Sequence, residues 1–262
     1  MAPDPQHSNP TVHTVTSADG TSIAYEREGN GQPLILLHGG SGTRRAWDTL
    51  RPYLADTFSL YIPDRRGRGD SGDNSDYSLA REAEDLRALV DAVSGTPIVF
   101  GHSFGGLVAL SAAPESTLDR LILYEPPVLV GEHSDGNLAA RMETRLNSGQ
   151  RQDAMRLFIE ENGTVSDVEK LPWWPEEANL HLTETVIREN YEVEAFDLSG
   201  LPEIAVPAVL LTGEQSPNHL RSGVTALDDH FVTNQLIELE NVGHVATETA
   251  PGKLASIIKS QA

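Results

Sequence analysis

Short apolar runs recur along the chain and alternate with segments whose apolar residues follow a helical period. Runs of this kind are typical of strands that are buried on both faces. The runs are Leu34–Leu37, Phe58–Ile62, Ile98–Phe100, Leu121–Tyr124, Val209–Thr212 and Leu236–Leu239. Because strands that alternate with helices are joined by right-handed crossovers, the pattern predicts a mostly parallel sheet.

An antiparallel pair is expected ahead of these strands. Thr11–Val15 and Thr21–Tyr25 are β-prone and flank Asp19-Gly20, a dipeptide typical of hairpin turns. Three groups of apolar residues fall on one face of a helix: Trp47, Leu50 and Leu54; Leu79, Leu86, Leu89 and Val93; and Leu254, Ile257 and Ile258. The expected fold class is therefore α/β, with a doubly wound, mostly parallel sheet and an N-terminal antiparallel hairpin.

One long stretch breaks the alternation. Residues 132–200 contain no convincing strand, but they contain helical segments near 138–146, 151–161 and 177–191 and the bulky sequence Pro172-Trp173-Trp174-Pro175. We predict a helical cap at 132–200 that lies over the active site and is inserted into a core made of residues 1–131 and 201–262. The alternative is an ordinary helical subdomain whose tryptophans are core residues.

Composition narrows the partners and the chemistry. The 262 residues are 39% hydrophobic, enough for one sizeable core. Lys and Arg number 19 against 39 Asp and Glu, and the net charge of −20 disfavours nucleic acid and anionic membranes as partners, although it also simply favours solubility. The absence of cysteine excludes disulfides, thiol nucleophiles and cysteine-based metal sites. No apolar run is long enough to span a membrane and the first twelve residues do not form a signal peptide, so a cytoplasmic protein is expected.

A candidate nucleophile lies directly after the third run. Gly101-His102-Ser103-Phe104-Gly105-Gly106 follows Ile98–Phe100 and precedes the helical Leu107-Val108-Ala109-Leu110, which is the strand-turn-helix setting that a G-x-S-x-G nucleophile elbow requires. Small flanking residues let the strand and the helix approach each other, and the helix N-terminus favours an oxyanion beside the serine. We therefore expect Ser103 to be the nucleophile.

A serine nucleophile needs a base, which is normally histidine. Of the nine histidines, His244 is placed best, because it follows the strand Leu236–Leu239 in a loop ahead of the last helix. His38 and His102 lie within other motifs and are interpreted as structural neighbours. We expect His244 to be the base.

These motifs together resemble the α/β-hydrolase fold superfamily. Leu37-His38-Gly39-Gly40-Ser41-Gly42 is similar to its oxyanion-hole loop, Asp64-Arg65-Arg66-Gly67-Arg68-Gly69-Asp70-Ser71 to its Asp-x-Arg-Gly-x-Gly-x-Ser loop, and Gly243-His244 to its catalytic-histidine loop. The motifs occur in the family's order from about residue 11 to the C-terminus. The resemblance implies an oxyanion hole made of the backbone N–H groups of Gly40 and Phe104, with Ser41 replacing Gly40 if the loop is shifted by one residue.

The expected acid is missing from its usual position. Ser216 stands where the family's pattern has aspartate, and serine cannot carry the charge that orients the histidine. The best replacement is Glu125, at the end of the strand Leu121–Tyr124, where some haloalkane dehalogenases and the zearalenone-type lactonases have a glutamate. Glu214 and then Glu248 are the next candidates. Alternatively, Glu125 only caps the Pro126-Pro127 turn or pairs with an arginine.

The expected function is hydrolysis of a carboxylic ester or lactone through an acyl-enzyme, with Ser103, His244 and Glu125 as the triad and with no metal and no cofactor. Trp173, Trp174, Phe158 and Tyr191 are expected to line an apolar pocket for a hydrophobic small molecule. Epoxide hydrolases and dehalogenases of this fold need a carboxylate at the elbow, which disfavours their chemistry here. Two alternatives remain: C–C bond hydrolysis or haloperoxidase-like chemistry on the same triad, and a degenerate protein that binds a hydrophobic ligand. A second copy of the chain, in a homodimer, is a further candidate partner.

Overall fold

The computed structural model describes residues 11–133, 136–162, 168–170, 174–175 and 178–262. Its centre is an 8-stranded sheet in the order β1-β2-β4-β3-β5-β6-β7-β8. The strands are β1 (Val12–Thr16), β2 (Ser22–Glu28), β3 (Gln32–Leu37), β4 (Phe58–Pro63), β5 (Ile98–His102), β6 (Arg120–Tyr124), β7 (Ala208–Gly213) and β8 (Asn234–Leu239). β2 pairs antiparallel with β1 and with β4, and every other pair is parallel. The predicted fold class, including the N-terminal hairpin, is confirmed.

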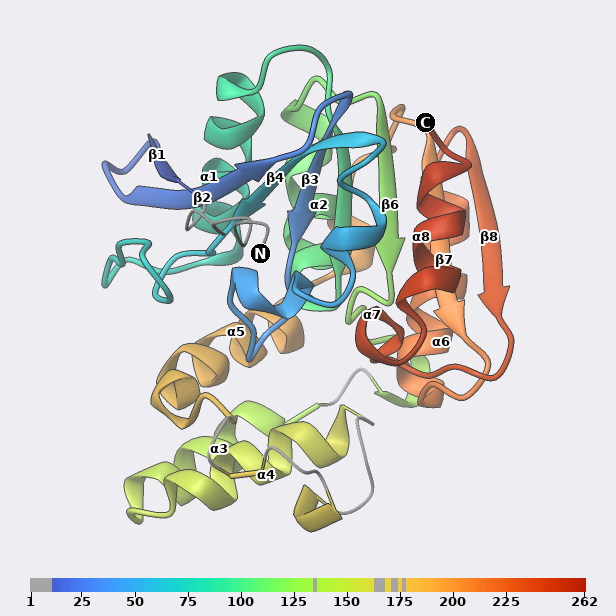
Figure 1. Cartoon of the computed structure of the whole chain (residues 1–262). Helices are drawn as coiled ribbons and strands as arrows, with labels where there is room; N and C mark the ends of the chain where they lie inside the picture. The colour runs from blue at the N-terminus through green and yellow to red at the C-terminus, as the bar shows by residue number, and fades with distance from the viewer. Residues whose placement is uncertain (1–10, 134–135, 163–167, 171–173, 176–177) are drawn as a thin grey trace, which may run out of the picture.

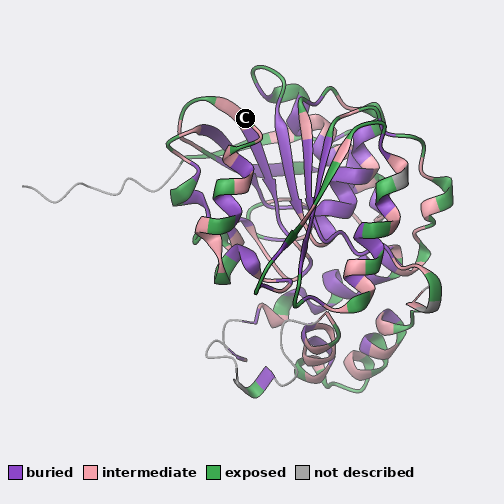
Figure 2. Ribbon diagram, turned by 90° about the vertical axis from the view of Figure 1, so that its right-hand side faces the viewer, coloured by how far each residue is buried: buried purple, intermediate pink, exposed green. Residues whose placement is uncertain are grey.

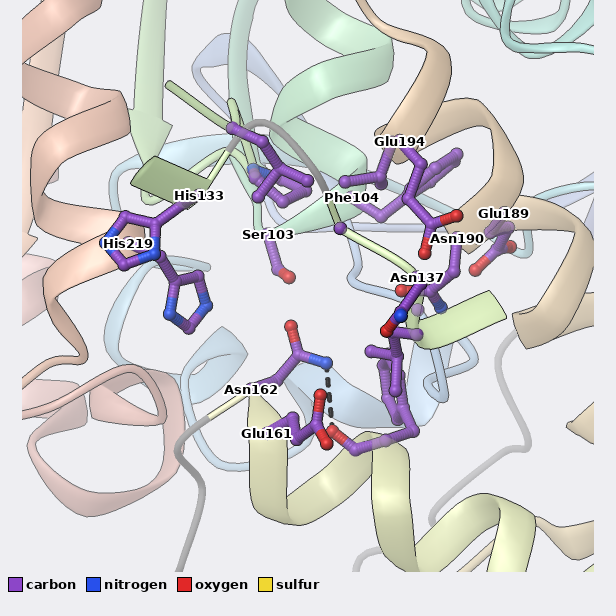
Figure 3. Close-up of a pocket in the computed structure, with 17 residues that line it drawn as sticks. Ser103, Phe104, His133, Asn137, Glu161, Asn162, Glu189, Asn190, Glu194 and His219 are labelled. Atoms are coloured by element: carbon purple, nitrogen blue, oxygen red, sulfur yellow. Dashed lines mark hydrogen bonds between the residues drawn. The ribbon is translucent and has the colours of Figure 1, made fainter. Parts of the chain in front are cut away.

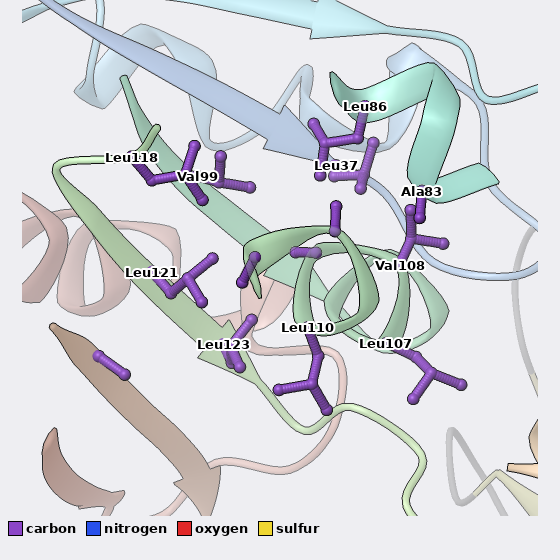
Figure 4. Packing of buried hydrophobic residues seen from close by; sticks show 14 of the residues in the cluster. Leu37, Ala83, Leu86, Val99, Leu107, Val108, Leu110, Leu118, Leu121 and Leu123 are labelled. Carbon is purple, nitrogen blue, oxygen red and sulfur yellow. The ribbon is translucent and has the colours of Figure 1, made fainter. Parts of the chain in front are cut away.

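Helices cover both faces of the sheet and one of its ends. They are α1 (Leu79–Ala92), α2 (Phe104–Ala112), α3 (Leu138–Asn147), α4 (Arg151–Glu161), α5 (Thr183–Ala195), α6 (Asn218–Leu227), α7 (Ala246–Thr249) and α8 (Pro251–Lys259). Successive strand residues point to opposite faces. Leu37, Val99 and Leu121 pack with α1, α2 and α6, whereas Phe100 and Ile122 pack with α8. Figure 4 shows the first of these layers around α2, and Figure 2 shows the buried strands between the outer helices.

Two elements differ from the sequence pattern. Trp47, Leu50 and Leu54 are fully buried as a helical stripe requires, but they do not lie on one α-helix. Trp47 ends a short 3₁₀ helix, η1 (Arg44–Trp47), and Leu50 and Leu54 flank a second one, η2 (Arg51–Tyr53). β8 is an edge strand, so Leu236 is 42% exposed although its apolar run predicted burial on both faces. An apolar run of four residues does not show whether a strand has one neighbour or two.

The segment between β6 and β7 contains α3, α4 and α5. These helices lie beyond the carboxyl ends of the parallel strands (Figure 1). α5 begins at Thr183, later than the sequence indicated. The three helices share a small apolar core that includes Met142, Met155 and Trp174. None of the helices among the described residues is both long enough and apolar enough to cross a membrane.

The contact between β5, β3 and α2 requires glycine at two positions. A Cβ on Gly105 would overlap with the carbonyl oxygens of Leu37 and His38, and a Cβ on Gly101 would lie 2.6 Å from Gly106 Cα. These are backbone atoms of packed elements, so a clash cannot be relieved by turning a side chain. The close approach fixes where α2 begins relative to the sheet.

Gly105→Ala is therefore expected to lower the free energy of unfolding by about 1–3 kcal/mol, the usual cost of overpacking a core. Gly252→Ala in α8 is the control, because its Cβ would lie 3.5 Å from Tyr53, an ordinary contact, and alanine favours helix by up to about 1 kcal/mol. Urea unfolding of the two variants measures the difference. Equal stabilities would contradict the close packing described for Gly105.

Candidate active site

Ser103 lies on a sharp turn between β5 and α2. Its backbone has φ 52° and ψ −129°, a region that residues with a side chain rarely adopt. The turn is held by the Ser103 N–H, which donates to Tyr124 O (2.9 Å), and by the Ser103 carbonyl, which accepts from Gly106 N–H (2.7 Å). The serine therefore precedes the first residue of α2, where the N-terminal peptide dipoles favour negative charge.

His244 lies in the loop between β8 and α7 and is buried. Two side chains hold this loop at consecutive carbonyl groups: the Tyr124 hydroxyl donates to Gly243 O, and His102 Nε2 lies 2.9 Å from His244 O. The His102 and His244 rings are 4.7 Å apart between centroids. His102 and Tyr124 thus position the backbone of His244, the expected base.

Glu125 follows β6 directly and is fully buried, with its backbone at φ 49°. Its Oε2 lies 2.7 Å from His244 Nδ1, and its Oε1 accepts from the Thr212 hydroxyl (2.9 Å) and from Gly213 N–H (2.7 Å). Burial acts to raise the pKa of this carboxyl, but His244, Ser216 and Gly213 outweigh it, and the pKa of Glu125 is lowered. The carboxylate is ionised and accepts the Nδ1 proton of His244.

The other candidate acids make no hydrogen bond to His244 among the described residues, although Glu248 lines the cavity that His244 also lines. Glu214 is exposed, and its carboxylate accepts a hydrogen bond from Asn241 N–H (2.8 Å). Ser216 is buried near Glu125 and acts to lower the pKa of that carboxyl, although its Oγ makes no regular hydrogen bond to any of the described residues. A serine thus lies beside the glutamate, in the position where the sequence led us to look for an aspartate.

The loop after β3 brings Gly39 and Gly40 to the serine. A Cβ on Gly39 would lie 3.1 Å from Ser103 Cβ, and Gly40 lines the same cavity as Ser103. Among the described residues, none accepts a hydrogen bond from the N–H of Gly40 or of Phe104. Both donors are thus available to an oxyanion at Ser103.

Two cavities lie over Ser103, and Gly40, Ser103, Phe158 and Asn162 line both of them. One cavity, of about 360 Å³, extends toward α5, and the other, of about 410 Å³, extends toward His244. In the first cavity, His133 and His219 lie on one side of Ser103, and Asn137, Glu189, Asn190 and Glu194 lie on the other (Figure 3). The cavities can hold a small molecule with its reacting carbonyl at Ser103.

The residues expected to line the pocket are divided. Phe158 lies over Gly40 between the two cavities. Neither Trp174 nor Tyr191 lines the two cavities. Trp174 is buried in the core of α3, α4 and α5, and Tyr191 is 40% exposed and donates to Glu143. Trp173 lies outside the described residues. The sequence did not indicate which face of α5 turns toward the serine. Apart from Phe158, the apolar lining of the first cavity comes from residues that the sequence did not single out for it: Phe104, Pro127, Leu129, Leu138 and Val193.

Sequence reasoning missed a buried charged cluster behind the oxyanion loop. Arg65 and Arg68, from the loop after β4, both contact Glu189 of α5. Three arginines within four positions, Arg65, Arg66 and Arg68, were a visible signal, because arginine is seldom buried without a partner. Glu189 carried no comparable signal in the sequence.

Comparison with known proteins gives a consistent family. Residues 34–257 match the profile of the alpha/beta hydrolase family. A crystal structure of an alpha/beta hydrolase from Sphaerobacter thermophilus superimposes with a TM-score of 0.80 at 34% identity, over 95% of this chain and 99% of that one.

Two relatives of known sequence are named for different activities. A soluble epoxide hydrolase from Corynebacterium is 32% identical over 122 residues, 45% of this chain, and this match spans only 43% of the relative's length. A pimeloyl-[acyl-carrier protein] methyl ester esterase from Aeromonas hydrophila is 24% identical over 254 residues, which are 91% of this chain and 98% of the esterase. These relatives are hydrolases with different substrates.

A pH dependence of stability follows from His38, which is fully buried. Burial, together with Arg65 and Arg68, lowers the pKa of His38 well below its usual range. The folded protein therefore keeps this imidazole neutral, while the unfolded chain takes up a proton as the pH falls below about 6.5. This contribution to stability is present above that pH and is lost as the pH decreases.

We expect His38→Gln to lose less stability than the native protein between pH 6.5 and 5, by up to about 1.4 kcal/mol per pH unit. Urea unfolding at three pH values measures both slopes, and the other titrating groups cancel in the comparison. Parallel slopes would contradict the neutral, buried state of His38.

Proposed function

The chain belongs to the alpha/beta hydrolase family, and on that premise we propose that it is a serine hydrolase that cleaves a carboxylic ester or lactone through an acyl-enzyme. The observation that carries the proposal is the 2.7 Å contact between His244 Nδ1 and the buried carboxylate of Glu125, in a loop that reaches the cavity of Ser103. A histidine held in this way presents Nε2 as the proton acceptor.

In the proposed first step, Ser103 Oγ attacks the carbonyl carbon of the substrate and His244 Nε2 takes the hydroxyl proton. The carbonyl oxygen becomes an oxyanion, which the N–H groups of Gly40 and Phe104 stabilise at the start of α2. Glu125 stabilises the imidazolium without taking its proton. The C–O bond then breaks, and the leaving alcohol receives the proton from His244.

In the second step a water molecule replaces the alcohol. His244 takes a proton from this water, the hydroxide attacks the acyl carbon, and the ester bond to Ser103 breaks as the serine recovers its proton. For a lactone the alcohol stays attached to the acyl chain and leaves with it. The two cavities beside Ser103 give the acyl part and the alcohol part separate space, with Phe158 between them.

The serine at the elbow argues for ester rather than epoxide chemistry. Epoxide opening in this fold needs a carboxylate that forms an alkyl-enzyme ester, and Ser103 cannot do this. The methyl ester esterase, which matches along 91% of this chain, supports an ester substrate more directly than the epoxide hydrolase, which matches along 45%.

The proposal predicts that the purified protein hydrolyses p-nitrophenyl esters of short or medium chain length and that Ser103→Ala abolishes this turnover. A phosphonate probe directed at serine nucleophiles should label the native protein at Ser103, as peptide mass spectrometry would show. Turnover that survives in Ser103→Ala would refute the proposal. A folded native protein with neither turnover nor label would favour the ligand-binding alternative.

Replacement of the proposed acid gives a second prediction. Glu125→Gln removes the charge that stabilises the imidazolium and supplies an amide to His244, so kcat should fall by a factor of about 10² to 10⁴. Glu214→Gln is the matched control, because Glu214 follows the neighbouring strand β7 but is exposed. Kinetics with one ester and circular dichroism of both variants provide the measurement.

A third variant separates the charge of Glu125 from its structural role. Ser216 is buried beside Glu125, so Ser216→Asp in the Glu125→Gln background should restore part of the lost kcat. If Glu125→Gln costs less than about threefold and Glu214→Gln costs more, the acid is Glu214 and our assignment is wrong.

A further inference from the structure

The oxyanion loop is held from behind by side chains at successive carbonyl groups. Arg65 Nη2 donates to Gly39 O (3.1 Å), and Arg68 Nη1 donates to Gly40 O and to Gly42 O (3.1 Å). Asn179 Nδ2 donates to Ser41 O (3.0 Å). Every peptide of the loop from residue 39 to residue 42 therefore has its carbonyl fixed by a side chain that is distant in the sequence.

These contacts determine where the amide protons of the loop point. The carbonyl of Gly39 and the N–H of Gly40 belong to one planar trans peptide, so they point in opposite directions. When Arg65 holds the carbonyl, the N–H is directed to the other side. Arg68 fixes the next peptide, which carries the Ser41 N–H, in the same way. Glycines rotate freely at φ and ψ, so a Gly-Gly sequence has little intrinsic preference for this orientation.

His38 also contacts the Gly39 carbonyl, which Arg65 holds. The Nε2 of His38 accepts a hydrogen bond from the backbone N–H of Arg65 (3.3 Å). The ring proton is therefore on Nδ1, which lies 2.9 Å from Gly39 O. The pKa of His38, lowered by burial and the two arginines, keeps the ring neutral and so preserves this donor.

Arg65 also contacts the second expected donor. Its guanidinium lies over the Phe104 ring, 4.8 Å from the centroid. Phe104 is the first residue of α2, and its N–H is the other half of the expected oxyanion hole. One side chain thus contacts the carbonyl of the peptide that carries the Gly40 N–H and also the ring of Phe104. The N–H groups of Gly40 and Phe104 are the two that must converge on the same oxygen.

Arg65 and Arg68 share the carboxylate of Glu189, which lies in α5. Glu189 Oε1 accepts from Arg65 Nη2 (2.8 Å) and from Arg68 Nη2, and the three side chains are at most 1% exposed. Arg65 is further held by both oxygens of Glu82 (2.9 and 3.0 Å). Glu189 belongs to α5, so the helix over the active site also fixes the arginines that hold the oxyanion loop.

Stability alone is a weak explanation for this cluster. Burying charges is costly, and apolar residues of similar volume often replace a buried ion pair without loss. Here Arg65 Nε, Arg68 Nε and Glu189 Oε2 have no hydrogen-bond partner among the described residues. A buried polar network that is only partly satisfied is costly, so stability alone does not account for these three residues.

We propose that Arg65, Arg68 and Glu189 are positioning residues that hold the Gly39-Gly40-Ser41 peptides with their N–H groups toward Ser103, so that α5 and the oxyanion hole are assembled as one unit. The proposal rests on the serine-hydrolase function proposed above. The three residues do not contact the reacting atoms; they act through the backbone of the loop.

The test compares Arg65→Lys, Arg68→Lys and Glu189→Gln with two control variants. Arg66→Lys is the first control, since Arg66 is as buried as its neighbours and pairs with Asp85 and Asp19, with no contact to the oxyanion loop. Arg188→Gln is the second, because Arg188 ties α5 to Asp73 without contacting the loop. Thermal unfolding of each variant accompanies the kinetics and measures general loss of stability.

Three readouts distinguish positioning from simple structural support. The positioning variants should lower kcat by tenfold or more relative to Arg66→Lys while KM changes less than threefold, because the oxyanion forms only after binding. Inhibition by an alkyl boronic acid, whose adduct with serine carries an oxyanion, should weaken by a similar factor. The carbonyl stretch of the acyl-enzyme in the infrared spectrum should move to higher frequency, because fewer N–H groups polarise the bond.

Several outcomes would overturn the proposal. The positioning role is excluded if the three variants match Arg66→Lys in kcat and in boronate affinity, or if only KM changes. If Arg65→Lys does not fold, Arg68→Lys and Glu189→Gln decide the question. If the phosphonate labels native Ser103 but the variants behave like the controls, only this inference fails. If the native protein is not labelled, the serine-hydrolase function fails and the positioning role fails with it.

Discussion

A single buried carboxylate connects the elements that make the site. Glu125 is reached by Thr212 and Gly213 at the end of β7 and by His244 from the loop after β8, so three adjacent parts of the sheet edge meet at its two oxygens. A buried carboxylate without partners is very costly, so the fold requires these contacts to offset the burial of Glu125. The same requirement that stabilises the fold therefore fixes the orientation of the histidine.

Glu125 also shows how the position of the acid relates to backbone geometry. Its φ of 49° turns the chain sharply after β6, which directs the side chain toward His244 across the end of β7. Ser216, which follows β7, is buried beside this carboxylate and adds no second charge. Two neighbouring carboxylates would raise each other's pKa, so a serine there is compatible with an ionised glutamate.

The loop after β4 contains three buried arginines, Arg65, Arg66 and Arg68, that connect it to several parts of the fold. Arg65 and Arg66 each pair with two carboxylates from different elements, and Arg68 pairs with Glu189. Arg66 ties the loop to α1 and to the β1–β2 turn, whereas Arg65 and Arg68 tie it to α5 and to the oxyanion loop. Pairing by planar guanidinium groups is directional, so the cluster sets relative orientation as well as proximity.

The sequence alone determined the sheet, its hairpin, and the serine, histidine and glutamate candidates. Apolar runs, the glycines of the elbow and the ends of strands are local signals, and parallel strands bring their carboxyl ends to one edge. The sequence could not determine the lining of the cavities. Trp174 and Tyr191 have large aromatic side chains of the kind that often line pockets. The packing of α3, α4 and α5 directs Trp174 into the core of these helices and leaves Tyr191 partly exposed to solvent. Nor could it pair Glu189 with arginines more than 120 positions away, because the helix face that turns inward depends on tertiary packing and not on composition.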